Sequence, residues 1–428
     1  MGIQSAMFSG VSGLNTNSQA MTVIGNNLAN TNTLGFKSSR SVFSDLLSSN
    51  IFGSGGSSQV GRGVGLSTVD SIYSQGTFET TSSDTDVAIE GEGFFVVSEL
   101  GDENQLYTRA GAFRFDDEGY LVNPEGYVVQ GKQFLADGTL DGGDPGDIRV
   151  ASTGLIEASA TTELTFETNL DANADELGVG VIDPDDNDTY NYSASSTVYD
   201  SLGEQHLVSA YWRLEDTATN TWSMAYTVDG ADITPIVDQL AFDGKGLHDA
   251  DGDGNPDGVA DDPLTVVIPV PADGDWDNGA EVGQEISLVF DCTQFDSDSV
   301  VIGQNQNGYG AGELTSVAIA ENGIVVASYS NGEQVNIAQL VLAKFQNTGG
   351  LELAGSNLLT ATENAGTIRI GLAGAELGNI FTNSLEQSTV DMGQEFVKMI
   401  TTQRGFQANS KIISTVDEML SELINLKR

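Results

Sequence analysis

Apolar side chains recur every seven residues near both ends of the chain, the spacing of a helix that presents one apolar seam. Near the C-terminus, Ser384 and Gln387 fit a capping box, and no proline follows them. We therefore predict one helix over residues 1–30 and a second over residues 384–428, paired through their seams. The seam positions are Met7, Leu14, Met21 and Leu28 in the first helix, and Met399, Phe406, Ile413, Val416, Leu420 and Leu423 in the second.

Neither helix is expected to be stable alone in water, because nothing within its own sequence covers the seam. Periodicity leaves two interpretations open: a coiled-coil-like pairing of the two ends, or two ordinary amphipathic helices on a globular core. The polar run Asn-Thr-Asn-Ser-Gln at residues 15–19 leaves little to bury on a core. This favours helices that pack against copies of themselves, where many weak contacts add up.

Between the helices the pattern changes to the alternation of apolar and polar residues that is typical of strands separated by turns. Residues 70–150 and 307–362 are predicted to form one inner β-domain, interrupted by an outer β-domain at residues 151–306. Residues 31–69 and 363–383 are predicted to be extended connectors. The predicted fold class is thus mostly β, with long coiled-coil-like terminal α-helices flanking an interrupted β-domain that carries an inserted β-domain.

The inserted segment is strongly acidic. The chain has a formal net charge of −46, and between residues 151 and 312 thirty-two acids are opposed only by Arg213 and Lys245. Nucleic acid and anionic membranes would be repelled, so neither is expected as a partner. No apolar run approaches the roughly 20 residues of a transmembrane helix, so membrane insertion is not expected. The start of the chain also lacks the basic and then apolar pattern of a cleaved signal peptide.

Residues that could perform catalysis are few. The two histidines, His206 and His248, are far apart in the sequence, and no nucleophile or phosphate-loop motif is complete. The single Cys292 excludes an intramolecular disulfide and a multi-cysteine metal site, and is expected to be a small buried residue. We therefore expect no enzymatic activity and no required cofactor.

One acidic loop has the spacing of calcium ligands. The run DADGDGNPDG places oxygen-bearing side chains at alternate positions around a glycine, like the first half of a calcium loop. Ala260 stands where an EF-hand has its bidentate glutamate, so a standard EF-hand is excluded. A solvated acidic loop remains the alternative interpretation. The candidate calcium ligands are Asp249, Asp251, Asp253, Asn255 and Asp257.

Three segments occur in a characteristic order: SGLNTNSQAMTVIGNNLANTNTLGFK (residues 12–37), TRAGAFRFDDEGYLVNPEGYVVQG (residues 108–131) and the C-terminal segment from residue 385. With them the chain resembles the bacterial flagellar rod and hook proteins. Its length, its large insertion and QRGFQANSK (residues 403–411) favour the hook members. A distal rod or hook–filament junction component is the alternative, and a calcium-binding adhesin a remote one.

The resemblance implies a structural subunit that self-assembles into a curved, flexible tubular homopolymer. Such a polymer transmits motor torque from rod to filament as a universal joint. The implied partners are other copies of the chain, the flagellar rod, the hook cap, hook–filament junction proteins and the flagellar type III export apparatus. The implied location is the basal body and hook, outside the cell, reached without a cleaved signal peptide.

The calcium interpretation predicts that Asp251→Ala/Asp253→Ala abolishes a calcium-induced rise in the melting temperature of the acidic domain. Ionic strength must be fixed, because salt alone also screens the self-repulsion of this segment. Thermal melts with and without calcium check this. An equal response of the wild-type and mutant proteins would show that the loop is only a solvated acidic turn.

Overall fold

The structure is a computed structural model that describes residues 2–46, 49–53, 56–102, 104–135, 138–150, 154–230, 233–243, 245–248, 263–270, 276, 278–374 and 376–425. The chain divides into two compact units. The first comprises Met1–Ser152, Ser316–Ala327 and Val335–Arg428, and the second comprises Thr153–Thr315 and Ser328–Gln334. The second unit therefore extends beyond the insertion predicted for residues 151–306. No helix of the described residues is long and apolar enough to cross a membrane.

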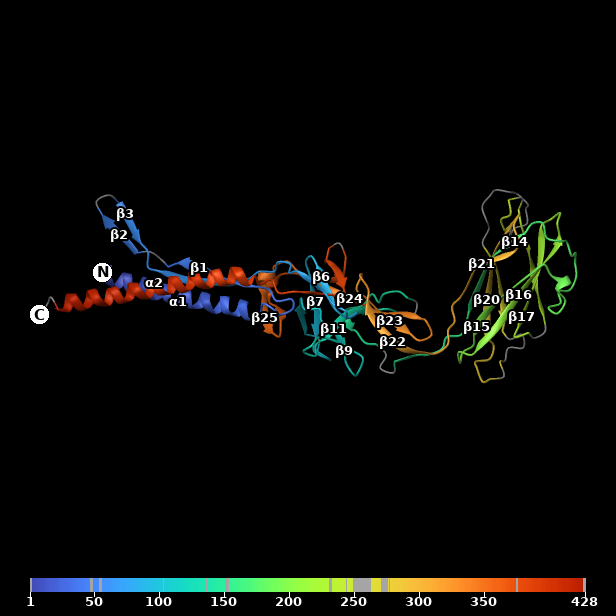
Figure 1. The fold of residues 1–428 in the computed structure, drawn as a ribbon, viewed down its shortest axis with the longest axis horizontal. Coiled ribbons are helices and arrows are strands. Elements are labelled where there is room, and N and C mark those ends of the chain that lie inside the picture. Colours follow the sequence, from blue (N-terminus) through green and yellow to red (C-terminus); the bar gives the residue numbers. More distant parts are fainter. Residues whose placement is uncertain are drawn as a thin grey trace. The chain divides into compact units, whose positions relative to one another are not determined.

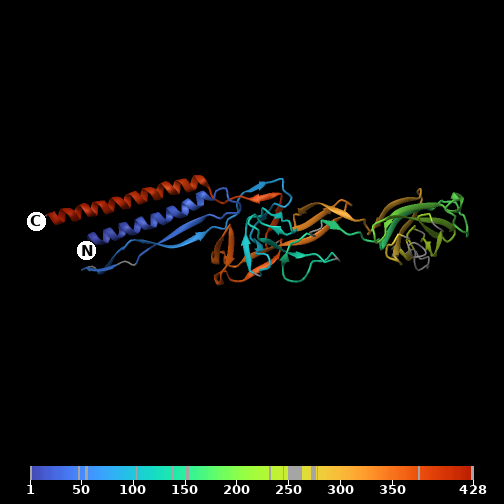
Figure 2. The same ribbon diagram turned by 90° about the horizontal axis from the view of Figure 1, so that it is seen from below.

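Two long helices of the first unit, α1 (Gly2–Ala29) and α2 (Met392–Asn425), run antiparallel side by side (Figures 1 and 2). The predicted start of the second helix is wrong. Ser384–Glu386 forms strand β29, which pairs with β5 (Phe78–Thr80), so this segment belongs to a sheet. The helix begins at Met392, where the Asp391 carboxylate accepts a hydrogen bond from the Gln394 amide at 3.1 Å.

A long β-hairpin follows α1 where the sequence predicts an extended connector. Strand β1 (Ser39–Asp45) pairs with β4 (Val64–Ser71), and β2 (Ser49–Gly53) pairs with β3 (Gly56–Val60). Both β1 and β4 pack on α1. The hairpin is the blue segment beside the helices in Figure 1. The predicted extended connector is thus ordered by strand pairing and by packing on α1.

The β-part of the first unit is built around a sheet whose central strands run in the order β24-β11-β7-β8-β26-β25. Alternate faces of β7 bury apolar side chains in two clusters, one around Phe95 and Val97 and the other around Phe94 and Val96. The strands, apart from those already given, are β6 (Val87–Glu90), β7 (Phe94–Ser98), β8 (Gln105–Thr108), β9 (Arg114–Phe115), β10 (Leu121–Val122), β11 (Val128–Gln133), β12 (Gly146–Asp147), β22 (Gly312–Ile319), β23 (Ile324–Tyr329), β24 (Gln334–Phe345), β25 (Leu351–Gly355) and β26 (Leu358–Ala361).

Residues 363–383 differ from the predicted connector. They contain β27 (Ile368–Leu372), which pairs with β24, and β28 (Asn379–Thr382), which pairs with β6. Ile380 of β28 is buried in the main cluster of this unit. The segment is therefore part of the β-domain, because its apolar positions complete a sheet that the sequence pattern alone does not reveal.

The second unit contains two four-stranded sheets, ordered β19-β20-β14-β21 and β15-β16-β17-β18. Strand β14 is parallel to β20, whereas the other pairs are antiparallel. The strands are β13 (Leu155–Ile156), which pairs with β22, β14 (Glu163–Asp171), β15 (Tyr192–Tyr199), β16 (Gln205–Asp216), β17 (Thr221–Val228), β18 (Thr234–Ala241), β19 (Leu264–Pro269), β20 (Glu285–Phe295) and β21 (Val300–Gln306).

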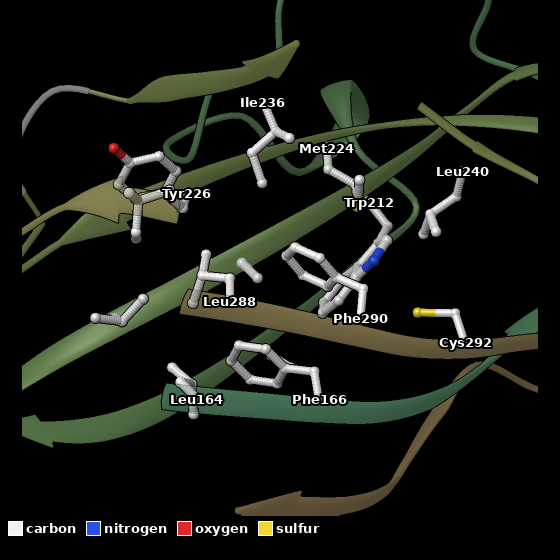
Figure 3. Close-up of a cluster of buried hydrophobic side chains, with 14 of the residues drawn as sticks. Leu164, Phe166, Trp212, Met224, Tyr226, Ile236, Leu240, Leu288, Phe290 and Cys292 are labelled. Atoms are coloured by element: carbon white, nitrogen blue, oxygen red, sulfur yellow. The ribbon is translucent and has the colours of Figure 1, made fainter. Parts of the chain in front are cut away.

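Aromatic side chains from both sheets meet in the core of this unit, as Figure 3 shows. The ring of Trp212 (β16) stands edge-on to Phe166 (β14) and to Phe290 (β20), with centroids 5.9 Å apart in each pair. Cys292 is buried beside them as expected, and burial raises the pKa of its thiol to about 12. The predicted fold class, mostly β with terminal helices, is confirmed.

Phe290→Ala should destabilise the second unit by about 3–5 kcal/mol, because it removes fully buried contacts and leaves a cavity. Urea denaturation followed by tryptophan fluorescence measures the change. Val267→Ala on the neighbouring strand is the control, since Val267 is exposed and its truncation should alter stability little. Equal effects of the two substitutions would contradict the assigned core.

Candidate functional site

The two terminal helices touch largely through small and polar residues, together with Ile413 of α2, which lies against Gly10 of α1. Gly10 and Gly13 are buried on α1 where α2 crosses closest. A Cβ added at Gly13 would lie 2.6 Å from Asn409 Nδ2, and one at Gly405 would lie 3.0 Å from Asn17 Oδ1. The helices therefore approach too closely for larger side chains. The buried positions of α1 are Gly10, Gly13, Thr16, Ala20, Ile24 and Asn27.

The predicted seam lies partly beside this contact. On α1, the seam residue Met7 is 41% exposed, and the other three are half-buried. On α2, Val416 is buried, whereas Phe406 and Leu420 remain 40% and 37% exposed. Met399 and Ile413 are half-buried, and the side chain of Leu423 lies outside the described residues. A single chain does not test assembly, so the role of these residues in self-assembly stays a prediction.

A buried polar cluster fixes the end of α1 to the beginning of α2. Asn27 exchanges two hydrogen bonds with the backbone of Ser39, at 2.8 and 2.9 Å, and its amide also donates to Glu395 at 3.4 Å. Glu395 forms a 2.6 Å ion pair with Lys398 one turn later. These bonds set the register of the helices and of the hairpin that starts at Ser39.

The strongest polar contact of the first unit is centred on Glu386, whose side chain is fully buried. Its Oε1 lies 2.6 Å from Lys37 Nζ, and its Oε2 lies 3.3 Å from an Arg109 guanidinium nitrogen. The Gly76 amide donates a further hydrogen bond to Oε1 at 2.7 Å. We call Lys37, Arg109 and Glu386 the ionic anchor. It connects the segment after α1, the β-domain and the strand that leads into α2.

The two cations of the ionic anchor are also satisfied by backbone carbonyls. Lys37 donates to Ser74 O at 2.6 Å, and Arg109 donates to Gly91 O at 2.7 Å. Burial lowers the pKa of Lys37 and of Arg109, and the negative charge of Glu386 opposes both shifts. The carboxylate therefore keeps both groups charged in a buried setting.

Gly35 allows the chain to reach the ionic anchor. Its backbone φ angle of +66° lies in a region that residues other than glycine rarely adopt. A Cβ at this position would lie 2.7 Å from the backbone nitrogen of Ala110. The Gly35 amide donates to the Glu386 carbonyl at 2.8 Å. The turn after α1 thus touches the β-domain and the approach to α2 together.

The outward surfaces of both helices carry large apolar side chains that nothing in the described chain covers. On α1, Phe8 is 67% exposed. On α2, Met392, Phe396 and Ile400 are about half exposed, and their spacing of four places them on one face. We call these the uncovered helix residues: Met7, Phe8, Val11, Met392, Phe396, Val397, Ile400, Phe406, Ile412, Met419, Leu420 and Ile424.

The candidate calcium ligands Asp249, Asp251, Asp253, Asn255 and Asp257 lie outside the described residues, so the calcium site stays a prediction. The sequence analysis also missed the ionic anchor. Lys37 and Glu386 are 349 residues apart in the chain, and no local pattern connects them. The available signal was weak, because neither Lys37 nor Arg109 stands out: Arg40 and Arg114 lie close to them in the sequence.

Glu386→Gln should lower the free energy of unfolding of the first unit by about 3–5 kcal/mol, because it leaves two buried cations without their counter-charge. Denaturant unfolding measures the loss. Glu92→Gln is the matched control, since Glu92 pairs with Lys344 at 2.8 Å on the exposed surface, where an ion pair contributes little. A comparable loss in the control would show that the ionic anchor contributes no more to stability than an exposed ion pair.

Models of protein families match four stretches of the chain. Residues 7–37 match "Flagella basal body rod protein", and residues 382–426 match "Flagellar basal body rod FlgEFG protein C-terminal". Residues 88–177 match "Flagellar hook protein FlgE/F/G D1 domain", and residues 169–309 match "Flagellar basal body protein FlaE D2 domain". The matches cover both helices and parts of both units.

Several flagellar hook proteins are similar to this chain in sequence over nearly its whole length. The flagellar hook protein FlgE of Borreliella burgdorferi is 34% identical over 447 residues, covering 99% of each chain. That of Escherichia coli K12 is 34% identical over 428 residues, covering 97% of this chain and 98% of the relative. The crystal structure of Helicobacter pylori flagellar hook protein FlgE2 has a similar fold, with a TM-score of 0.51 and 16% identity, and covers 72% of this chain and 100% of that one. This chain belongs to the family of flagellar hook proteins.

Proposed function

We propose that this flagellar hook protein is a non-catalytic structural subunit that assembles with copies of itself into the hook. The observation that carries the proposal is the set of uncovered helix residues. Phe8, Val397 and Ile424 are each more than 60% exposed although their helices are already paired. Large apolar surfaces of this kind mark sites of association in soluble proteins.

Helices of neighbouring copies are the partner that fits these residues. Full burial of one large apolar side chain contributes roughly 1.5–3 kcal/mol. Many such contacts per subunit are needed to offset the loss of freedom on association, and the uncovered helix residues of both helices can supply them. Ridges of Met392, Phe396 and Ile400 can pack between side chains of a facing helix. A continuous layer of helices around a central channel would satisfy this requirement for every copy.

The proposed mechanics follow from the difference between the two units. The ionic anchor and the Asn27 cluster make the helix pair and the β-domain a stiff element, which suits the transmission of torque. The second unit carries most of the acids of the chain and should repel its copies at the outer surface. Small, sliding contacts there would let a curved tube bend at each rotation, as a universal joint between rod and filament requires.

The family also supports a set of partners and a location. We infer contacts with the flagellar rod, the hook cap and hook–filament junction proteins, and passage through the flagellar type III export apparatus to the outside of the cell. A chain without an intramolecular disulfide suits passage in an unfolded state, since no covalent crosslink must be broken. A straight polymer would instead indicate a distal rod or junction component, and a stable monomer an adhesin; similarity to hook proteins over nearly the full length favours the hook.

Phe396→Asp and Leu420→Asp should each block polymerisation, because an unpaired charge in a packed helical interface costs several kcal/mol. The monomer should stay folded, since both side chains are at least a third exposed there. Electron microscopy and sedimentation of the purified chain measure polymer formation, and circular dichroism checks the fold.

The matched control is Val179→Asp, which introduces the same charge at an 88% exposed apolar residue of the second unit. This variant should polymerise like the wild type. Normal curved polymers from Phe396→Asp would contradict assembly through the uncovered helix residues. Failure of the control alone would place the essential contacts in the second unit.

A further inference from the structure

A histidine in the second unit has one ring nitrogen that is buried and has no hydrogen-bond partner. His206 lies at the start of β16 and is 9% exposed. Its Nδ1 lies 2.7 Å from Asp229 Oδ2, while Nε2 is buried without a partner. Trp276 covers the imidazole by stacking, with ring centroids 3.6 Å apart. A buried polar atom left in this way needs an explanation.

The contact with Asp229 decides which nitrogen carries the proton. A carboxylate can only accept hydrogen bonds, so Nδ1 carries a proton and donates it to Asp229. The Leu207 amide holds the other oxygen of Asp229 at 2.8 Å and so fixes the carboxylate. Nε2 is therefore the ring nitrogen that is left to bind a metal. Histidines that bind metals are commonly oriented by this hydrogen bond to a carboxylate.

Two carboxylates lie on the side of Nε2. Asp200 Oδ2 is 3.6 Å from Nε2, and Asp200 has a fully buried side chain. The ligand atoms of Asp200, Glu204 and His206 all lie within 4.8 Å of one another. Two ligands at about 2.1 Å from a tetrahedral ion are separated by roughly 3.4 Å. The Asp200–His206 pair is therefore already at nearly the spacing that one ion requires, and the exposed Glu204 side chain can close on it.

The surroundings keep the carboxylates in place. The Asn278 amide donates to Asp200 Oδ2 at 2.6 Å and to Glu204 Oε2 at 2.9 Å. A carboxylate oxygen that accepts one N–H has a further electron pair available for a metal.

We propose that Asp200, Glu204 and His206 bind a divalent transition-metal ion, for which zinc is the best chemical match. Calcium and magnesium take oxygen ligands, whereas an imidazole nitrogen with two carboxylates suits zinc. The ion would occupy the space in front of Nε2 and would close the hairpin of β15 and β16, from which all three ligands come. This site is separate from the candidate calcium loop and does not depend on the proposed assembly.

Calorimetric titration of the metal-free, full-length chain with zinc chloride tests the proposal, in buffer with excess calcium to occupy sites that have only oxygen ligands. One equivalent of zinc should bind, and Glu204→Gln should weaken its binding at least about tenfold. Glu281→Gln is the matched control, because Glu281 is an exposed acid near the same turn and outside the cluster. It should bind zinc like the wild type.

NMR of the His206 side chain supplies a readout specific to the ring. Zinc should shift the Nε2 resonance and leave Nδ1 protonated, in the wild type and in Glu281→Gln. If both glutamine variants bound zinc equally weakly, the ion would be attracted only by the acidic surface in general, and the proposal would be overturned. The proposal would also be overturned if zinc left the Nε2 resonance unchanged, because the ion would then not be bound to the ring.

Discussion

The structure of the first unit depends on one buried carboxylate that holds two buried cations. Glu386 could not be buried alone, because a buried carboxylate loses its hydration. Only closely placed cations and hydrogen-bond donors offset the free energy of this desolvation. Lys37 comes from the turn after α1 and Arg109 from the β-domain, so the ion pairs form only when three distant segments meet. The ionic anchor therefore fixes the segment after α1 and the segment before α2 to each other and to the β-domain.

The helix pair shows why such an anchor is needed. Among the buried positions of α1 only Ile24 is a large apolar residue, so α1 contributes little apolar area to the interface. Close approach gives good van der Waals contact and a fixed geometry, but a small hydrophobic contribution. Large side chains such as Phe8 and Phe396 instead stay exposed in the single chain. The pair is thus held at its base by ionic and polar contacts, and its apolar surface remains available for other copies.

The sequence predicted the terminal helices and the mostly β fold, because both depend on local periodicity. The helix start at Ser384 was wrong because β29 pairs with β5, a tertiary contact that overrides a local capping signal. The heptad pattern included Ile413, which lies against Gly10, and the buried Val416. It missed the small residues at adjacent positions, such as Gly13 and Ala20. The ionic anchor could not be predicted, since its members lie hundreds of residues apart and only folding brings them together.

The two units differ in surface chemistry in a way that suits opposite demands. The uncovered helix residues gain free energy whenever another copy covers them, so contacts through α1 and α2 should be extensive and hard to break. The second unit has a large aromatic core of its own. Its thirty-two acids between residues 151 and 312 make close contact between copies unfavourable. A polymer of such chains would be cohesive where the helices meet and yielding where the acidic units meet, which is the combination that a bending tube under torsion requires.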